Sequence, residues 1–229
     1  MFGLDAYEKV IDDLLKKGYI FTDFLSDLNK NSICLRHDVD VSVEAAYKIA
    51  LIEKDIGIKA NYFFMLTSYS YNSLSDDNRS LIKKIHELGH AISLHFDPSI
   101  YSDIDNYFVK EKELFENIFD VNINFVSIHR PRDFLKDNNR KLKDCYHSYE
   151  DRFFKNMLYL ADSAGRDIRS DLKNLLTGKN INPIHLLIHP IWWTTKTLSC
   201  TDTLNNWLEE NNDFLTSQIR LNHRTYRKS

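Results

Sequence analysis

The stretch "SICLRHDVDVSVEAAYKIALIEKDIGIKANYFFML", residues 32–66, indicates the fold class of this chain. It begins with a short apolar run, continues as an amphipathic segment from Ser42 to Gly57, and ends in a second apolar run. Serine is a common N-cap and glycine a common C-terminal stop, so the middle segment is expected to be a helix. Two strands joined through one helix are typical of a βαβ unit with parallel strands.

The same alternation continues along the rest of the chain. We expect further strands at 90–96, 123–129, 156–162 and 184–189, and helices at 1–18, 75–89, 102–119, 166–178 and from 202 onward. No glycine-rich phosphate loop follows the first strand, which argues against a dinucleotide or P-loop fold. The pattern predicts an α/β protein with a mostly parallel sheet, in a single domain over residues 1–229. The least regular stretch, 131–155, is expected to shape a site.

Composition narrows the classes of function. The 229 residues are 43 % hydrophobic and 28 % charged, with a formal net charge of −3, so a general nucleic-acid binder is not expected. Three cysteines without a C-x-x-C pair argue against a disulfide scaffold or a thiolate zinc site. The N-terminus is not of the signal-peptide type and no apolar run reaches 18 residues. We therefore expect a cytoplasmic protein without a transmembrane segment.

The segment "HELGH", residues 86–90, spells the H-E-x-x-H pattern of many zinc proteases. That pattern needs both histidines on one continuous helical face. Gly89 stands directly before His90, where a helix is expected to end, and the following residues alternate like a strand. His86 is therefore predicted on a helix and His90 at a strand entrance, so a zincin site is not expected.

Ionisable residues collect at the carboxyl ends of the expected strands. In parallel β/α folds this rim is where ligands bind. Charged side chains at buried strand ends are costly unless they are paired or bound to a metal, so five such ends predict a catalytic site. The residues are His37, Asp38, Asp40, His95, Asp97, His129, Arg130, Asp162, Arg166 and His189.

The mixture of carboxylate and imidazole groups indicates the chemistry. Asp and His side chains suit zinc or another first-row divalent metal. A metal with an open position can lower the pKa of its bound water to about 7. A second carboxylate could take the proton and a histidine could protonate the leaving group, which describes hydrolysis of an amide or ester.

The motifs "RHDVD", "GHAISLHFD", "HRP" and "LLIHPIWW" occur in that order over about residues 32–193. Together they resemble the NodB-homology polysaccharide deacetylases, carbohydrate esterase family 4 in the broad sense, and most closely an intracellular branch with RHDVD and HPxWW motifs. The resemblance implies an irregular (β/α) barrel of about seven strands, of the glycoside hydrolase/deacetylase type. It also implies a divalent metal, usually zinc, and removal of acetyl groups from N-acetyl sugars.

The resemblance also assigns roles to single residues. Asp38 would be the general base, and Asp40 and His95 metal ligands. Arg130 would orient the base carboxylate, and His189 would be the general acid.

The chain departs from the family at Ser99, where the second motif usually has another histidine. His129 is the first candidate to complete the metal site, followed by Asp97, otherwise assigned to substrate binding, and then by His37.

Two further pairs are predicted to contact the substrate. Trp192 and Trp193 either stack on a sugar ring or are core aromatics. Asp162 and Arg166 either orient the substrate as a pair or form an ordinary ion pair.

Three functions remain as hypotheses. The first is a metal-dependent N-deacetylase acting on a sugar nucleotide, a lipid-linked oligosaccharide or a polysaccharide precursor. The second keeps the metal and changes the substrate to a non-sugar amide. The third is a non-catalytic glycan-binding protein, which Ser99 suggests because a ligand is expected there. The oligomeric state does not follow from the sequence.

Overall fold

The computed structural model describes residues 3–136, 140–178, 182–197 and 199–227. The strands are β1 Ile20–Thr22, β2 Ser32–Val39, β3 Asn61–Phe64, β4 Ala91–Phe96, β5 Phe125–Ile128, β6 Tyr146–His147, β7 Leu158–Ala161 and β8 Ile184–Ile188. The α-helices are α1 Leu4–Lys16, α2 Val43–Ile56, α3 Asp76–Glu87, α4 Ile104–Phe119, α5 Asp151–Phe154, α6 Arg169–Thr177 and α7 Cys200–Asn222. Short 3-10 turns are η1 Pro98–Ile100, η2 Phe134–Lys136, η3 Ser163–Gly165 and η4 Pro190–Trp192.

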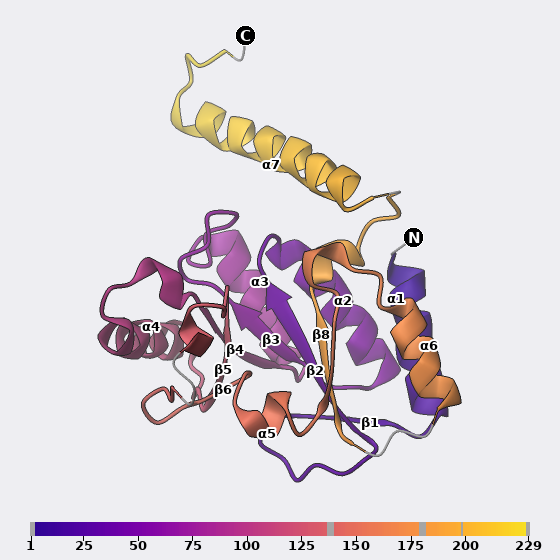
Figure 1. Ribbon diagram of the computed structural model, residues 1–229. Helices are drawn as coiled ribbons and strands as arrows, with labels where there is room; N and C mark the ends of the chain where they lie inside the picture. The colour runs from indigo at the N-terminus through magenta and orange to yellow at the C-terminus, as the bar shows by residue number, and fades with distance from the viewer. Residues whose placement is uncertain (1–2, 137–139, 179–181, 198, 228–229) are drawn as a thin grey trace.

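The strands form one curled sheet in the order β6-β5-β4-β3-β2-β8-β7, with β1 added beside β2. Every pairing between these strands is parallel. Helices flank the sheet, which closes into a half-barrel (Figure 1). The predicted α/β class and the irregular (β/α) barrel type are confirmed.

The first βαβ unit forms as its sequence predicts. The Ser42 hydroxyl accepts a hydrogen bond from the Ala45 backbone N–H at 3.1 Å, which caps α2. Gly57 ends α2 with φ 85°, a left-handed conformation that glycine adopts without strain. Sequence periodicity did not predict β1, β6 or α5, because elements of two to four residues are too short to show a period.

The two faces of the sheet carry different side chains because successive residues of a strand point to opposite sides. On β2, Ile33 and Leu35 pack in the large core between the sheet and the helices. Cys34 points to the concave side, where it packs in a smaller aromatic cluster, and by alternation Arg36 and Asp38 share that side. That cluster comprises Phe24, Cys34, Phe63, Phe125, Phe153 and Met157.

The predicted alternation of β4 is also confirmed. Leu94 and Phe96 belong to the large core, while the hydroxyl of Ser93 donates to the Phe125 carbonyl at 2.6 Å and His95 contacts Ser127. The concave side of the sheet is therefore aromatic at the amino ends of its strands and polar toward their carboxyl ends.

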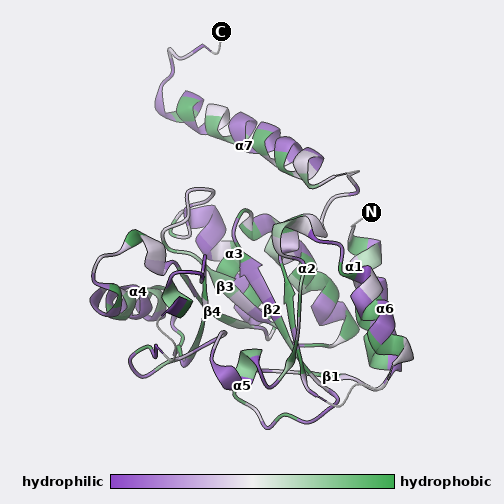
Figure 2. Ribbon diagram, in the orientation of Figure 1, coloured by the Kyte–Doolittle hydropathy of each residue, from purple (hydrophilic) through white to green (hydrophobic). Residues whose placement is uncertain are grey.

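The irregular stretch 131–155 contains η2, β6 and α5, and its residues 137–139 lie outside the described part. Among the described residues, no helix is long and apolar enough to cross a membrane. The last helix, α7, extends away from the sheet and its flanking helices (Figure 1), and its surface alternates between apolar and polar residues (Figure 2).

Candidate metal centre

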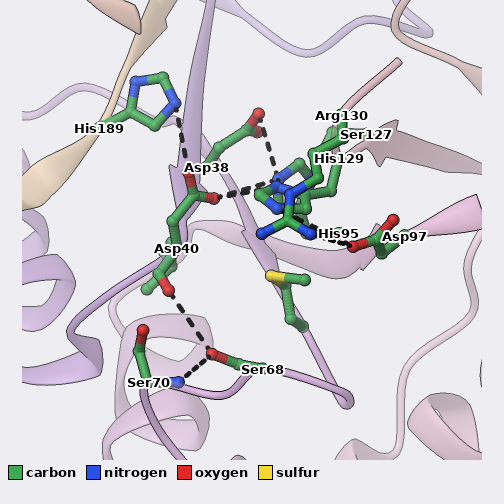
Figure 3. Close-up of polar contacts among 12 residues, drawn as sticks. Asp38, Asp40, Ser68, Ser70, His95, Asp97, Ser127, His129, Arg130 and His189 are labelled. Carbon is green, nitrogen blue, oxygen red and sulfur yellow. Dashed lines mark hydrogen bonds and ion pairs between the residues drawn. The ribbon is translucent and has the colours of Figure 1, made fainter. Parts of the chain in front are cut away.

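Three side chains from neighbouring strand ends converge at the carboxyl rim of the sheet (Figure 3). The Oδ1 atom of Asp40 lies 3.1 Å from Nε2 of His95 and 3.7 Å from Nδ1 of His129. The two imidazole nitrogens are 3.1 Å apart. Among the described residues, these three form the one group of His, Cys, Asp or Glu side chains whose ligand atoms all lie within 4.8 Å of one another.

The sheet brings these groups together because β2, β3, β4 and β5 are consecutive parallel strands: Asp40 follows β2 and His95 lies on β4, with β3 between them. His95 pairs in register with Ser127 of β5, and the Ser127 hydroxyl lies 2.5 Å from Nδ1 of His95. That contact leaves Nε2 of His95 directed at Asp40. His129 follows β5 by one residue, so it reaches the same point from the next strand.

The arrangement fits a divalent metal. Tetrahedral zinc with N and O ligands at 2.0–2.1 Å separates its ligand atoms by about 3.3 Å, close to the spacings above. The Oδ1 atom of Asp40 is buried and, apart from its ion-pair contacts with these two imidazoles, has no hydrogen-bond partner, as expected for an atom that could bind an ion. His129 completes the group of three that could hold a metal, whereas the Ser99 hydroxyl bonds to Asp97 at 2.5 Å.

Asp38 lies beside this group and is held by a guanidinium. Nε and Nη2 of Arg36 donate to its two carboxylate oxygens at 2.8 and 2.6 Å. Burial favours the neutral acid, but the charges of Arg36 and His95 outweigh burial and hold the pKa of Asp38 well below its usual range. Asp38 is therefore an ionised carboxylate, 3.6 Å from Nε2 of His95.

His189 approaches from the opposite side, at the end of β8. Its Nδ1 lies 2.6 Å from Oδ1 of Asp162, and its Nε2 lies 3.7 Å from Oδ2 of Asp40. The indole N–H of Trp193 donates to the other Asp162 oxygen at 2.8 Å. Burial lowers the pKa of His189, but the hydrogen bond and charge of Asp162 raise it to about 9. His189 is thus protonated at neutral pH.

The buried carboxylate of Asp162 also anchors the backbone. The N–H of His189 lies 3.0 and 3.1 Å from its two oxygens. Asp162 is fully buried between β7 and the turn after β8, so it orients His189 and is not exposed to a substrate. The prediction that Asp162 contacts the substrate with Arg166 is wrong: a turn with Ala164 at φ 55° separates them, and Arg166 pairs with Asp171 at 2.6 Å.

Arg130 does not orient the base carboxylate. It has a left-handed φ of 47°, so the chain turns at the end of β5 and its side chain is 63 % exposed. Its nearest acid is Asp97, at 3.9 Å. Arg36 takes the predicted position beside Asp38 instead. Spacing along β2 could have identified Arg36, because residues two apart on a strand share a face.

The tryptophans are core residues and do not form a platform for a sugar. Trp193 is completely buried, with its ring edge-on to Tyr7 at 5.7 Å, and Trp192 is 9 % exposed. The hydrogen bond of its indole N–H to Asp162 holds the ring of Trp193 in the interior, directly after η4. Of the two alternatives for this pair, stacking on a sugar ring or packing in the core, the structure shows packing in the core.

Asp97 is buried beneath the rim. Its Oδ1 accepts hydrogen bonds from the backbone N–H and the hydroxyl of Ser99 at 2.9 and 2.5 Å. Its Oδ2 lies 3.9 Å from Nε2 of His129, on the side of the ring away from Asp40. Asp97 therefore lies behind His129, where carboxylates often stand behind metal-bound histidines, and does not itself join the group of three.

His37 points to the other face of β2 and is not a ligand. Its Nε2 lies 2.7 Å from Oε1 of Glu53, which also accepts the hydroxyl of Tyr7. Oε2 of Glu53 accepts the Tyr62 hydroxyl at 2.5 Å and lies 3.5 Å from Nδ1 of His90. His90 is thus part of a buried network under α2, whereas His86 is exposed on α3, so the two histidines of the H-E-x-x-H pattern do not share one helical face.

A cavity of about 650 Å³ lies apart from this rim, between η2 and α5. Its walls include Phe134, Arg140, Tyr149, Arg152 and Phe154, and none of the predicted site residues lines it. The ionisable groups that converge at the carboxyl rim therefore lie outside this cavity.

No protein-family model matches the sequence, and no curated protein matches it. Among solved structures, the chain is similar to a CE4 family pseudoenzyme from Bacillus anthracis, with 16 % identity, a TM-score of 0.47, and coverage of 81 % of this chain and 62 % of that one. A mutant of that pseudoenzyme with restored enzymatic activity matches with 15 % identity, a TM-score of 0.47, and coverage of 81 % and 64 %. The chain spans less than two thirds of these structures. Both structures are described as members of the CE4 family, the family that the sequence motifs resemble.

Proposed function

We propose that this protein is a divalent-metal-dependent hydrolase that removes an N-acyl group, with acetyl as the first candidate, from a sugar or glycan precursor. The observation that carries the proposal is the convergence of Asp40, His95 and His129 beside an ionised Asp38 and a protonated His189. Zinc is the first candidate metal because the donor set is one carboxylate and two imidazoles.

The two flanking residues have complementary protonation states. A bound divalent ion would supply activation of a water molecule and polarisation of the amide carbonyl. Asp38 is ionised and can accept the proton of the attacking water. His189 can donate the proton on Nε2 to the departing amine nitrogen, because its Nδ1 is engaged by Asp162. The base and the acid therefore lie on different sides of Asp40.

The sugar substrate follows from the resemblance alone. The burial of Trp193 removes the aromatic platform that had favoured a sugar over another amide. A sugar nucleotide, a lipid-linked oligosaccharide and a polysaccharide precursor are the first substrates to test, with a non-sugar amide as the alternative.

Metal content separates the metalloenzyme from a glycan-binding protein. We expect stoichiometric zinc by mass spectrometry of the purified protein, and its loss in His129→Ala and Asp40→Asn. His86→Ala is the matched control, because His86 is an exposed histidine outside the group. Equal metal content in all four proteins, or none in the wild type after zinc loading, contradicts the assigned site.

Hydrolysis tests the assigned roles. We expect acetate release from N-acetylglucosamine oligomers or from the corresponding sugar nucleotide, and its loss in Asp38→Asn and His189→Gln while zinc is retained. An N-acetyl amino acid tests the non-sugar alternative in parallel. Oligosaccharide binding without acetate release by a zinc-loaded protein would favour the non-catalytic hypothesis.

A further inference from the structure

The last helix, α7, has a large apolar surface that the rest of the chain does not cover. Its first turns are attached to the core through Leu204 and Trp207. Beyond them the helix stands clear of the sheet (Figure 1), and five large apolar side chains are 40–75 % exposed: Leu208, Phe214, Leu215, Ile219 and Leu221. An apolar surface of this kind on a soluble domain usually marks an interaction site.

These side chains form a stripe along the helix. Leu204, Leu208, Leu215 and Ile219 are spaced by four, seven and four residues, which places them on one face of an α-helix. Trp207, Phe214 and Leu221 recur every seven residues along the edge of the same face. The buried Thr216 lies off this stripe, so its burial leaves the stripe exposed.

The charges of α7 and of the residues after it are separated along the chain, with Arg220 inside the helix and Arg224 and Arg227 beyond its end. Residues 200–213 carry four acidic side chains and no lysine or arginine, whereas residues 214–227 carry three arginines and no acidic residue. Two such helices side by side repel each other at both ends when parallel and attract each other when antiparallel. Antiparallel helix dipoles also favour the second arrangement.

We propose that the apolar stripe of α7 is a dimerisation surface whose occupant is α7 of a second copy of this chain, paired antiparallel. A two-fold axis passing near Phe214 and Leu215 places the acidic half of each helix beside Arg220 of the other and beside the arginines that follow that helix. The pairing buries the exposed stripe of both copies, Leu208–Leu221, over about 20 Å of helix. A membrane surface fits less well, because interfacial helices carry mainly Lys and Arg on their polar face and the first half of α7 is acidic there.

The mass of the full-length protein in solution tests the proposal. Light scattering coupled to size-exclusion chromatography is expected to give the mass of two chains for the wild type at micromolar concentration. The double variant Leu215→Glu/Ile219→Glu is expected to give the mass of one chain. Asn206→Glu/Ser217→Glu adds the same charge on the polar side of α7 and is expected to stay dimeric. Circular dichroism and thermal unfolding check that all three proteins are folded.

Disulfide trapping tests the antiparallel geometry. In a Cys200→Ser background the remaining cysteines, Cys34 and Cys145, are buried. Leu215→Cys lies near the proposed axis and is expected to form a dimeric disulfide, whereas Leu208→Cys is expected not to, because its copies lie about 20 Å apart along the paired helices. A monomeric wild type, equal trapping of both cysteines, or flotation of a monomer with anionic phospholipid vesicles would overturn the proposal.

Discussion

Replacing Asp162 by asparagine isolates what holds His189 in its protonated form. The substitution keeps the shape of the side chain and removes its charge. The pKa of His189 is raised from 6.5 to about 9, and the hydrogen bond and charge of Asp162 are the main causes of the increase. In Asp162→Asn burial still lowers the pKa of His189 and the charges of Asp40 and Asp38 still raise it, so we expect this pKa to fall toward 6.5.

The size of the effect on activity depends on pH. At pH 8 a group with a pKa of 9 is about 90 % protonated, and one with a pKa of 6.5 about 3 %. The general-acid form is thus reduced about 30-fold at pH 8 and hardly at all at pH 5.5. We expect the basic limb of the kcat/KM profile to move from near pH 9 to near pH 6.5. Asp171→Asn is the control, because Asp171 is an acid that pairs with Arg166 outside the site.

Stability provides a readout that does not require activity. Because the folded protein binds the His189 proton more tightly than the unfolded chain, this contribution is fully present below pH 6.5 and is lost as the pH rises through 9. A difference of 2.5 pKa units corresponds to about 3 kcal/mol. Urea unfolding of the wild type and of Asp162→Asn from pH 6 to pH 10 should show the difference between them shrinking by that order as the pH rises.

NMR titration of labelled histidines measures the pKa of His189 directly in both proteins. We expect one resonance, absent in His189→Gln, to titrate near pH 9 in the wild type and near pH 6.5 in Asp162→Asn. If His189 titrates near 6.5 in the wild type, or still near 9 in the variant, Asp162 is not the group that controls it.

Three other substitutions test the packing around the site. Arg36→Met leaves the buried carboxylate of Asp38 without its counter-charge. Urea unfolding should show a free energy of unfolding lower by about 3–5 kcal/mol, and adding Asp38→Asn should restore part of that loss. Glu53→Gln removes the charge at the centre of the buried network under α2 and should cost about 3 kcal/mol; an unchanged unfolding midpoint would show that Glu53 is neutral in the folded protein. Gly165→Ala places a Cβ 1.9 Å from Sγ of Cys200, at a residue whose φ of 74° disfavours a side chain. Thermal unfolding should show a loss of stability of about 1–3 kcal/mol, and adding Cys200→Ala should restore part of that stability.

Local patterns of the sequence predicted the elements that carry the site. The caps at Ser42 and Gly57 predicted α2 because capping depends on backbone groups within one turn. The alternation of β4 predicted which face carries His95, because side chains of a strand alternate whatever it pairs with. His129 was the first candidate to complete the metal site because it ends a neighbouring strand, and in the structure its ring lies beside Asp40 and His95.

Partners across the fold could not be predicted in the same way. Spacing along β2 places Arg36 on the same face as Asp38, but whether Arg36 or Arg130 reaches that carboxylate depends on where the end of β5 lies relative to β2. The turn at Arg130, with φ 47°, decides that question by directing its side chain outward. Burial of Trp193 likewise depends on Asp162, which lies 31 positions away along the chain.

By itself the sequence determined the alternation of strands and helices, the face on which each strand residue lies, and the set of acids and histidines at the strand ends. These properties depend on residues within a few positions of one another. Only the tertiary structure decided that Arg36 holds Asp38, that Asp162 raises the pKa of His189, and that His37 belongs to a buried network with Glu53. Those pairings depend on how the curled sheet brings distant segments within hydrogen-bond distance, and the electrostatic energy of a buried pair depends on that distance and on the exclusion of water.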